Sequence, residues 1–421
     1  MPVSVILTRA SGKSHAVYGW DESEPSKLKY SSSSMITVRN YKFRLYPTKE
    51  IEAKLVETLE INRIVYNYFV SNNFRSFHDT CYSLVELKEQ QPILRNYHSK
   101  MLQMVGNRVA GAWRALEALK EHGRKVGRLR FCEPGECNSF TYNQSGFRID
   151  NDKLHLSKIG SIKIVMHRQP AHIKQVTVVR QNGRWYGVAA CETTKLVFKF
   201  IDPLKSVGID VGITKFAHDS DNHVIENPQF LTKMFRPLKR AQRKLSRRKK
   251  GSNNREKAKS WVARLHERIA NKRRDFLHKV SAEYSSKYDV IFLERLRILN
   301  MVRNHHLARH ILDSGWGTFK AMLEYKAKMV IEVESAYTSV DCSRCGHTVP
   351  KSLAVRTHRC DRCGLVIGRD YNASLNILQK GLMMLPQGLR EFTPVEIAPL
   401  LASVGGQARS LKQEAHEFIR G

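Results

Sequence analysis

Two pairs of cysteines toward the carboxyl-terminal end of the chain constrain its fold more than any other sequence feature. Fourteen residues separate the two Cys-x2-Cys pairs, which are Cys342 with Cys345 and Cys360 with Cys363. A glycine follows each pair and permits the tight turn in which two thiolates share one ion. Four thiolates close a tetrahedral Zn²⁺ site that has no open position. The spacing therefore predicts a structural zinc module over 338–364.

The alternative interpretation of these cysteines is two unrelated thiol pairs or a redox pair. His347 and His358 lie close by in the sequence, and either could replace a cysteine, but four cysteines already complete the site. We therefore expect that neither histidine is a zinc ligand. We also expect the basic loop between the two cysteine pairs to face nucleic acid. The other four cysteines show no comparable spacing, and this usage favours an intracellular protein over a secreted disulfide scaffold.

The chain carries a strong excess of positive charge. Its 421 residues include 71 Lys and Arg against 39 Asp and Glu, which gives a formal net charge of +32. Such a charge attracts polyanions, so we expect nucleic acid as the partner, with an anionic membrane surface as the weaker alternative. No stretch approaches the ~18 apolar residues that a membrane span needs. These features predict a protein that stays in the cytoplasm and does not enter a membrane.

The spacing of apolar residues changes several times along the chain and indicates a multidomain α+β protein. Alternation begins at Met35, gives way to helical spacing after Pro47–Thr48, and returns from about residue 129 to residue 200. The early strand can complete a β-barrel formed by the later ones, so the helical part would be an insertion into that barrel. We predict a β-barrel at 35–47 and 126–202, a helical insertion at 48–125, an α/β domain at 203–337 and 365–380 that carries the zinc module, and two segments without a regular pattern, 1–34 and 381–421, which could be disordered.

The α/β region contains several predicted elements. Val207–Ile213 and Asp289–Glu294 are expected to be strands, and 314–332 and 370–380 are expected to be helices. Between the two strands, a helical hairpin turns at Gly251–Asn254. Its second helix carries a predicted apolar stripe that consists of Trp261, Leu265, Ile269, Phe276 and Val280.

One acidic residue lies in the middle of a predicted strand. Asp210 shares a strand face with Gly208 and Gly212, because side chains two residues apart point the same way. The two glycines leave the carboxylate bare, so we expect a phosphate backbone to approach it closely. The simpler alternative is a strand aspartate in a salt bridge, but the flanking glycines argue against crowded packing.

Two further acidic residues end or begin predicted elements. Glu294 ends an apolar strand, where a carboxylate is costly unless it is paired or binds metal, and Arg295 is the simpler partner. Asp370 begins a helix, where its simpler role is that of an N-cap. Together with Asp210 they form the layout of RNase H-like nucleases, which hold two divalent cations roughly 3.5–4 Å apart. Hard oxygen ligands favour Mg²⁺ or Mn²⁺, so we predict a catalytic site of these three acids.

The helical hairpin is the most basic part of the chain. Residues 236–274 contain 17 Lys and Arg against 2 Glu. A solvated face is the simpler explanation of a charge run, but this imbalance is repulsive without a polyanion. We predict that ten of its cations bind nucleic acid: Arg243, Lys244, Arg247, Arg248, Lys249, Lys250, Arg264, Arg268, Lys272 and Arg273.

Eight short stretches add up to a family pattern. They are Tyr41–Thr48, Gly208–Ala217, Leu245–Gly251, Asn271–Lys279, Phe292–Leu296, Ser314–Phe319, Thr338–Gly346 and Arg369–Ile377. On these stretches the chain resembles the TnpB (OrfB) proteins of bacterial and archaeal insertion sequences and their relatives, the compact type V CRISPR effectors. The resemblance spans about residues 35–380, and the combination is specific although each stretch alone is not.

The resemblance implies an RNA-guided endonuclease that cuts double-stranded DNA in a prokaryotic cytoplasm, at the nucleoid. A guide RNA derived from the transposon end pairs with a target beside a short motif, and a RuvC nuclease domain cuts both strands. The family's catalytic acids map onto Asp210, Glu294 and Asp370, and its zinc knuckle maps onto the four cysteines. The barrel resembles the family's wedge domain, and the helical insertion resembles its recognition domain. Motif-reading residues of the family fall near Gln103 and Thr141.

Three other functions stay open on the sequence alone. A strand-joining transposase of the His-hydrophobic-His kind needs two histidines around one apolar residue, whereas His305 and His306 are adjacent. A regulator that binds DNA without cutting it would be expected to lose one of the three acids, and none is missing. A CRISPR effector shares the same core and would differ only in its neighbouring genes. We expect the protein to act as a monomer.

Overall fold

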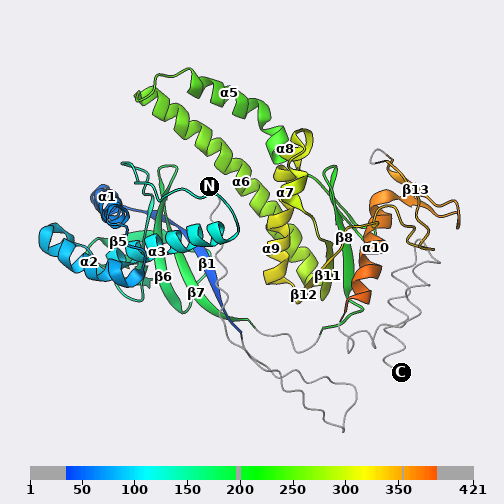
Figure 1. Cartoon of the computed structure of the whole chain (residues 1–421), viewed down its shortest axis with the longest axis horizontal. Coiled ribbons are helices and arrows are strands. Elements are labelled where there is room, and N and C mark those ends of the chain that lie inside the picture. Colours follow the sequence, from blue (N-terminus) through cyan, green and yellow to red (C-terminus); the bar gives the residue numbers. More distant parts are fainter. Residues whose placement is uncertain (1–34, 196–200, 353–354, 386–421) are drawn as a thin grey trace, which may run out of the picture.

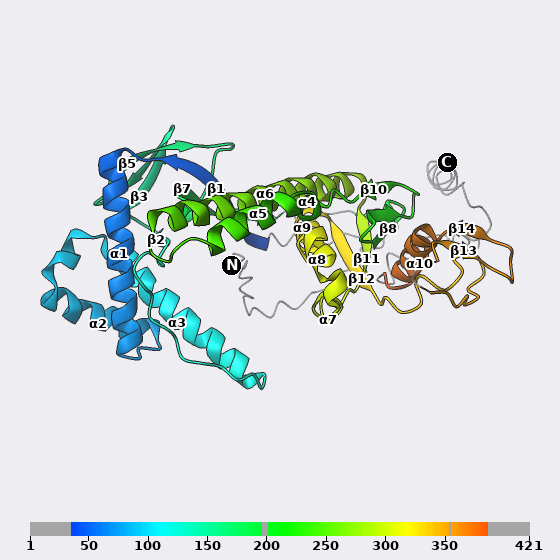
Figure 2. The ribbon, with the colours of Figure 1, turned by 90° about the horizontal axis from the view of Figure 1, so that it is seen from above.

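The computed structural model describes residues 35–195, 201–352 and 355–385. The prediction for 1–34 lies outside these residues, and so does the prediction for 381–421 from residue 386 onward. Its start is wrong, because helix α10 (Arg369–Met383) continues through residues 381–383. Two sheets dominate the described chain, and the long helix α6 (Asn253–Lys287) extends from one toward the other (Figures 1 and 2). None of the helices in these ranges is long and apolar enough to cross a membrane.

The first sheet has seven antiparallel strands in the order β2-β6-β7-β1-β5-β4-β3. Its strands are β1 (Met35–Tyr46), β2 (Ser139–Asn143), β3 (Phe147–Asp150), β4 (Lys153–Leu156), β5 (Gly160–Val165), β6 (Ile173–Gln181) and β7 (Arg184–Lys195). Strand β1 lies between β5 and β7, which follow it by more than a hundred residues. The early strand therefore joins the later ones, as its alternating pattern predicts.

The sheet is nearly closed but is not a complete barrel. Among the described residues, no ladder of hydrogen bonds joins the edge strands β2 and β3. The hydroxyl of Tyr142 in β2 instead donates to the carbonyl of Ser157, in the turn between β4 and β5, at 2.6 Å. The predicted β-barrel is thus corrected to a sheet that stays open between β2 and β3.

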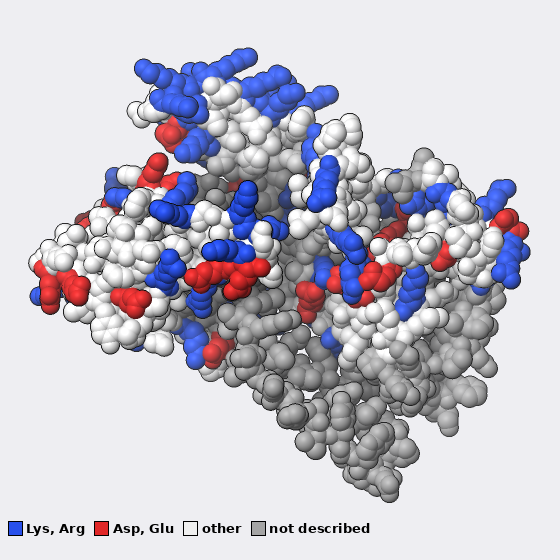
Figure 3. Space-filling model, viewed as in Figure 1, with Lys and Arg blue, Asp and Glu red and all other residues white. Residues whose placement is uncertain are grey.

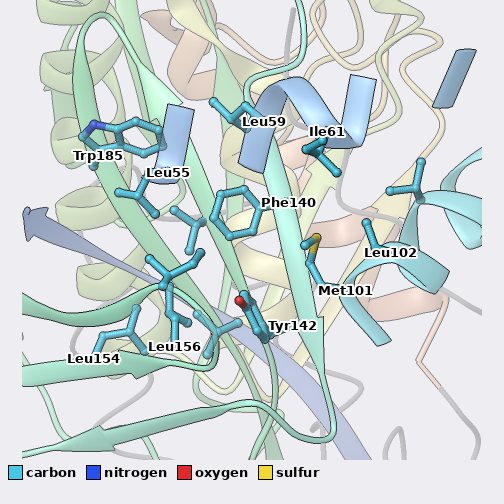
Figure 4. Packing of buried hydrophobic residues seen from close by; sticks show 14 of the residues in the cluster. Leu55, Leu59, Ile61, Met101, Leu102, Phe140, Tyr142, Leu154, Leu156 and Trp185 are labelled. Carbon is cyan, nitrogen blue, oxygen red and sulfur yellow. The ribbon is translucent and has the colours of Figure 1, made fainter. Parts of the chain in front are cut away.

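Helices cover the inner face of this sheet. They are α1 (Lys49–Ser71), α2 (Phe77–Gln90), the 3-10 turn η1 (Pro92–Asn96) and α3 (Ser99–Glu121). The side chain of Thr48 accepts a hydrogen bond from the backbone of Ile51 and caps α1, as predicted for the Pro-Thr start. Apolar residues of the helices and of the sheet form one continuous core, which includes Leu55, Leu102, Phe140 and Trp185 (Figure 4). The helical insertion and the sheet therefore depend on each other for burial.

The second sheet has five strands in the order β10-β9-β8-β11-β12. They are β8 (Ser206–Val211), β9 (Lys215–Asp219), β10 (Val224–Glu226), β11 (Val290–Glu294) and β12 (Met329–Val333). Strands β8, β11 and β12 are parallel, β9 runs antiparallel to β8, and β10 runs antiparallel to β9. The carboxyl ends of β8 and β11, which carry two of the predicted acids, consequently lie side by side.

Helices pack on both faces of the second sheet. One face contacts α6 and α9 (Trp316–Lys326) through a core that includes Val207, Ile209 and Phe319, and the other contacts α10 (Arg369–Met383). Short helices α4 (Phe230–Lys233), α7 (Ile298–Met301) and α8 (His305–Ser314) connect these layers, and β13 (Thr357–Arg359) pairs with β14 (Val366–Gly368) in the cysteine-rich module. Because side chains alternate along β8, Val207 and Ile209 face the layer of α6 and α9, whereas Gly208 and Asp210 face α10.

The predicted helix over 314–332 is wrong in its second half. Helix α9 ends at Lys326, and residues 329–333 form strand β12, which pairs in parallel with β11. The run Met329-Val330-Ile331-Glu332-Val333 is rich in β-branched residues, which fit a pleated surface better than a helix. Its apolar residues continue the helical spacing closely enough to hide the change.

The predicted helical hairpin is confirmed. Helix α5 (Phe235–Ser246) and α6 pack together, and Gly251, with φ of +80°, lies in the turn between them. The predicted apolar stripe is only partly confirmed: Leu265, Ile269 and Val280 are buried, whereas Trp261 is 51% exposed.

Candidate active site and metal centre

Asp210 lies on the face of β8 that α10 covers. A Cβ atom at Gly208, on the same face, would lie 2.4 Å from the carbonyl oxygen of Ser374 and 2.5 Å from the amide of Leu378. Gly208 therefore lets the helix backbone approach the strand, and the prediction that it leaves room for a phosphate is wrong. This close packing is what brings the first turn of α10 next to Asp210.

Glu294 ends β11, the parallel neighbour of β8. It follows the paired residues Leu293 and Ile209, which puts it level with Asp210 at the same edge of the sheet. The hydroxyl of Thr338 donates a hydrogen bond to one oxygen of Glu294. Arg295 forms its ion pair with Glu334, at 2.5 Å, and so is not the partner that the simpler interpretation assigned to Glu294.

Asp370 is the second residue of α10. Gly368 occupies the N-cap position, and no side chain caps this helix, so the N-cap role for Asp370 is wrong. A carboxylate in the first turn is nevertheless favoured by the helix dipole. Its nearest ion-pair partner is Arg356, at 3.9 Å.

The electrostatics show that the three acids come together. Burial raises the pKa of Asp210 well above its usual range, and the negative charges of Glu294 and Asp370 raise it further, while Arg369 acts in the opposite direction. Burial also raises the pKa of Glu294. Like charges held together out of water are unfavourable unless a cation neutralises them. Three carboxylates are the hard oxygen donors that suit Mg²⁺ or Mn²⁺, so the residues fit the predicted cation site.

We expect Asp210→Asn to raise the melting temperature of the protein in buffer without Mg²⁺ or Mn²⁺. Because the folded pKa of Asp210 is raised, the stabilising effect of its proton is complete below the unfolded pKa, about 3.9, and is lost as pH rises through the folded pKa. The wild type should therefore lose stability above about pH 4 and the variant should lose less. Thermal melting between pH 5 and 8 checks this, with the exposed Asp275→Asn as a control; a variant that melts below the wild type at pH 7 would contradict it.

The four predicted cysteines form a compact cluster. The sulfur atoms of Cys342 and Cys363 are 3.5 Å apart, those of Cys345 and Cys360 are 3.6 Å apart, and all four lie within 4.8 Å of one another. A tetrahedral site with Zn–S distances of about 2.3 Å has sulfur–sulfur edges of about 3.8 Å, so the cluster fits one zinc ion. Within the described ranges it is the only such group of three or more potential ligands, and the three carboxylates are more widely spaced.

The two nearby histidines are not part of this cluster, as predicted. His347 forms an ion pair with Asp361 at 3.2 Å, and the Nδ1 atom of the buried His358 is hydrogen bonded to Lys351. The cysteine module is therefore complete with its thiols alone.

Three family models match the chain. The OrfB_IS605 model, described as "Probable transposase", matches residues 201–305; the "Cas12f1-like, TNB domain" model matches 316–377; and a helix-turn-helix domain model matches 35–79. The first range contains Asp210 and Glu294, and the second contains the cysteine cluster and Asp370. TnpB-like protein L79 of Acanthamoeba polyphaga mimivirus is 30% identical over 142 residues, which are 31% of this chain and 27% of that protein.

Two bacterial relatives match most of the chain. A Streptomyces pristinaespiralis protein named "Putative RNA-guided DNA endonuclease" is 33% identical over 366 residues, which cover 82% of this chain and 89% of the relative. "Putative RNA-guided DNA endonuclease InsQ" of Escherichia coli strain K12 is 34% identical over 315 residues, or 69% and 74% of the two chains. The chain belongs to the TnpB (OrfB) family. Its likeness to the solved structure titled "Cryo-EM structure of the Cas12f1-sgRNA-target DNA complex" is distant, with a TM-score of 0.45 and 14% identity over 82% of this chain and 99% of that chain.

In this TnpB-family chain the cysteine module is tied to the helix that carries Asp370. The Asn372 side chain accepts from the backbone of Ser343 at 3.0 Å and donates to the carbonyl of Asp341 at 2.7 Å. Asn376, one turn further on, donates to the same carbonyl and to that of Thr338, at 2.8 Å each. Sequence reasoning missed these roles, although two buried asparagines four residues apart in an apolar helix are a signal that could have been noticed.

The basic hairpin of this TnpB-family chain presents most of its predicted cations to solvent. Figure 3 shows the Lys and Arg side chains gathered over α5 and the start of α6. All the predicted hairpin cations except Arg273 are exposed. Arg273 is partly buried and pairs with the buried Asp313 at 2.5 Å, so its prediction as a nucleic-acid contact is corrected to a link between α6 and α8.

The two candidate motif-reading residues lie near one cavity of about 180 Å³ between α1, α3 and β2. Thr141 lines this cavity together with Met104 and Arg108, and its hydroxyl is 2.9 Å from that of Thr177. Gln103 is partly buried on α3 and does not belong to the lining. The structure therefore brings only Thr141 to the cavity.

Proposed function

We propose that the protein is an RNA-guided DNA endonuclease encoded by an insertion sequence. The observation that carries the proposal is the meeting of Asp210, Glu294 and Asp370 at one edge of the five-stranded sheet. Two relatives, 33% and 34% identical to this chain, bear names of that activity. A protein that only binds DNA has no need of three carboxylates held together against their mutual repulsion.

Different structural elements position the three acids of the proposed active site. Asp210 and Glu294 are fixed by adjacent parallel strands, and Thr338 orients Glu294 through its hydrogen bond. Asp370 is held by α10, whose dipole favours the ionised carboxylate. In sites of this kind, bound Mg²⁺ or Mn²⁺ ions activate water and stabilise the leaving oxygen, so the products should carry 5′-phosphate and 3′-hydroxyl ends.

The proposed partners are a guide RNA derived from the transposon end and a double-stranded DNA target. Base pairing would supply the specificity, and protein cations would hold the sugar-phosphate backbones. We assign the backbone contacts to the exposed cations of the hairpin, and the reading of the short motif beside the target to the neighbourhood of Gln103 and Thr141. The four cysteines would hold a structural zinc ion.

The experiment that tests this function begins with the RNA. The protein is expressed with its native flanking DNA, the RNA that co-purifies is sequenced, and plasmids with matched and mismatched targets are incubated with the complex and Mg²⁺. We expect one discrete RNA with a variable 3′ end, and cleavage of both strands of the matched plasmid only. Heterogeneous cellular RNA without guided cleavage would refute the proposal and favour a transposase or a DNA-binding regulator.

We expect the salt dependence of RNA binding to identify the hairpin as the backbone contact. Each phosphate contact contributes about 0.7–0.9 to the slope of log K against log salt, so replacing Arg247, Arg248, Lys249 and Lys250 together with alanine should reduce the magnitude of the slope by about 3. Filter binding between 50 and 400 mM salt measures it. Arg273→Ala is the contrasting variant: it should leave the slope unchanged but lower stability by on the order of 3 kcal/mol, because Asp313 loses its partner. An unchanged slope in the fourfold variant would exclude this role.

A further inference from the structure

One large aromatic side chain of the hairpin lies outside its core. The small core between α5 and α6 consists of Leu238, Ala241, Leu265 and Ile269 with a few partly buried neighbours, and Trp261 is not among them. The indole of Trp261 is 51% exposed. No aromatic ring and no cation of the described residues stacks on it. Burying an indole is favourable, so this exposed ring is an apolar surface available to a ligand.

The other described tryptophans are all used within the fold. Trp185 and Trp316 are 2% and 5% exposed. Trp113 is partly buried, and the guanidinium of Arg75 lies over its ring at 4.9 Å. Within residues 35–195, 201–352 and 355–385, Trp261 is therefore the one tryptophan with its ring available to a ligand.

Trp261 lies in a row of cations. Lys257, Arg264 and Arg268 precede and follow it at intervals of three or four residues, so the four side chains fall within about one sixth of the circumference of α6. The three cations are exposed, and none has an ion-pair partner in the described part of the chain. The row borders the buried stripe of α6, whose residues Leu265 and Ile269 pack against α5. A flat aromatic surface with positive charges on both sides matches a nucleobase with its flanking phosphates.

The same features argue against a membrane or an apolar protein partner. A helix that binds a lipid surface presents a broad apolar face, whereas Trp261 is the only apolar side chain in this row. A duplex interior offers no free base surface, so the ring can stack only on an unpaired or terminal base. We propose that Trp261 is a stacking platform for an unpaired base of a single-stranded RNA or DNA, whose adjacent phosphates contact Lys257, Arg264 and Arg268. This inference rests on the proposed function and names the chemistry that the hairpin recognises.

The test compares two substitutions of different character, made in the Asp210→Asn background so that no substrate is cut. Trp261→Phe keeps an aromatic surface, and Trp261→Leu keeps an apolar side chain without one. The probes are 15-nucleotide oligouridylate, 15-nucleotide oligothymidylate and heparin, which has charge but no bases. We expect Trp261→Leu to bind the oligonucleotides about 5-fold to 150-fold more weakly, Trp261→Phe to retain most of the affinity, and heparin to bind all three proteins equally. A larger loss for one oligonucleotide identifies RNA or DNA as the source of the base.

Tryptophan fluorescence gives a second readout. Stacking should quench the emission of the wild type with either oligonucleotide but not with heparin, and the quenched component should be missing from Trp261→Phe. Tyr82→Ala removes an aromatic side chain that is 64% exposed on α2 and should change nothing. Equal losses in the Phe and Leu variants, unchanged oligonucleotide affinity in the Leu variant, or a blue shift of the emission with vesicles of anionic phospholipid would each overturn the inference. Since none of these measurements requires cleavage, they can fail while the nuclease proposal holds, and the reverse.

Discussion

Replacing Asp210 with asparagine should lower cleavage of the matched target by at least about a thousandfold while the RNA still co-purifies. A ligand of catalytic divalent cations contributes several kcal/mol to the transition state, and about 4 kcal/mol corresponds to a thousandfold. Asparagine has nearly the same shape but half the oxygen ligands and no charge. Gel analysis of plasmid cleavage under single-turnover conditions measures the rate.

The stability of this variant makes the test specific. Loss of a structural aspartate lowers both the melting temperature and the activity, whereas the raised pKa of Asp210 means that its loss should stabilise the fold in the absence of divalent cations. The combination of a higher melting temperature with no cleavage would therefore separate a cation ligand from a structural residue. Retained cutting by the variant would sink the assignment of the site. Asp275→Asn, on the exposed surface of α6, should cut like the wild type.

The second large effect is expected from loss of zinc. The protein should hold about one zinc ion per chain after dialysis, and Cys345→Ser should lose both the zinc and at least about 99% of the cleavage activity. The apparent binding energy of a structural zinc ion is about 10–16 kcal/mol, and here it supports a module that Asn372 and Asn376 tie to α10. When the module loosens, the helix loses its brace, and Asp370 moves out of register with the other two acids.

Atomic absorption measures the zinc, and protection of backbone amides from hydrogen exchange locates the loosened region. Protection should fall over 338–383 and remain in the first sheet, whose core does not contact the module. Cys81→Ser, a free cysteine on α2, is the matched control and should keep zinc and activity. Asn372→Ala should keep the zinc but lose part of the activity, and full activity in that variant would contradict the bracing role. A folded protein without zinc would contradict the metal assignment itself.

The sequence was most informative where chemistry fixes the spacing of residues. Two Cys-x2-Cys pairs can form only a few structures, and strong helical or alternating periodicity predicted β1, α1, α5 and α6. The three acids were found because a strand aspartate, a later strand glutamate and a helix-start aspartate together form the layout of RNase H-like nucleases. What the sequence could not reveal was which partner each side chain meets, since that depends on packing between distant elements.

Gly208 and Arg273 illustrate this limit. A glycine beside a strand aspartate predicts an open surface, but the structure fills that surface with Ser374 and Leu378 of a helix much later in the chain. A basic residue within a basic run predicts a surface contact, but Arg273 forms an ion pair with the buried carboxylate of Asp313, forty residues away. For Trp261 the prediction was wrong in the opposite direction. Its helical spacing fits the buried stripe, but its indole lies outside the core between α5 and α6 and is 51% exposed. Local pattern defined the elements, and long-range packing defined the roles of individual side chains.

The chain order of the proposed active site has a consequence for a protein that is still being made. The hairpin and the strands with Asp210 and Glu294 are complete before the four cysteines of the zinc module are synthesised, and Asp370 follows these four. A ribosome therefore releases the surface proposed to hold RNA well before it releases the last cation ligand. In a cell short of zinc, the finished chain would likewise have the surface proposed to hold RNA but no positioned Asp370. Under the proposed function, such a chain would bind RNA without cutting DNA.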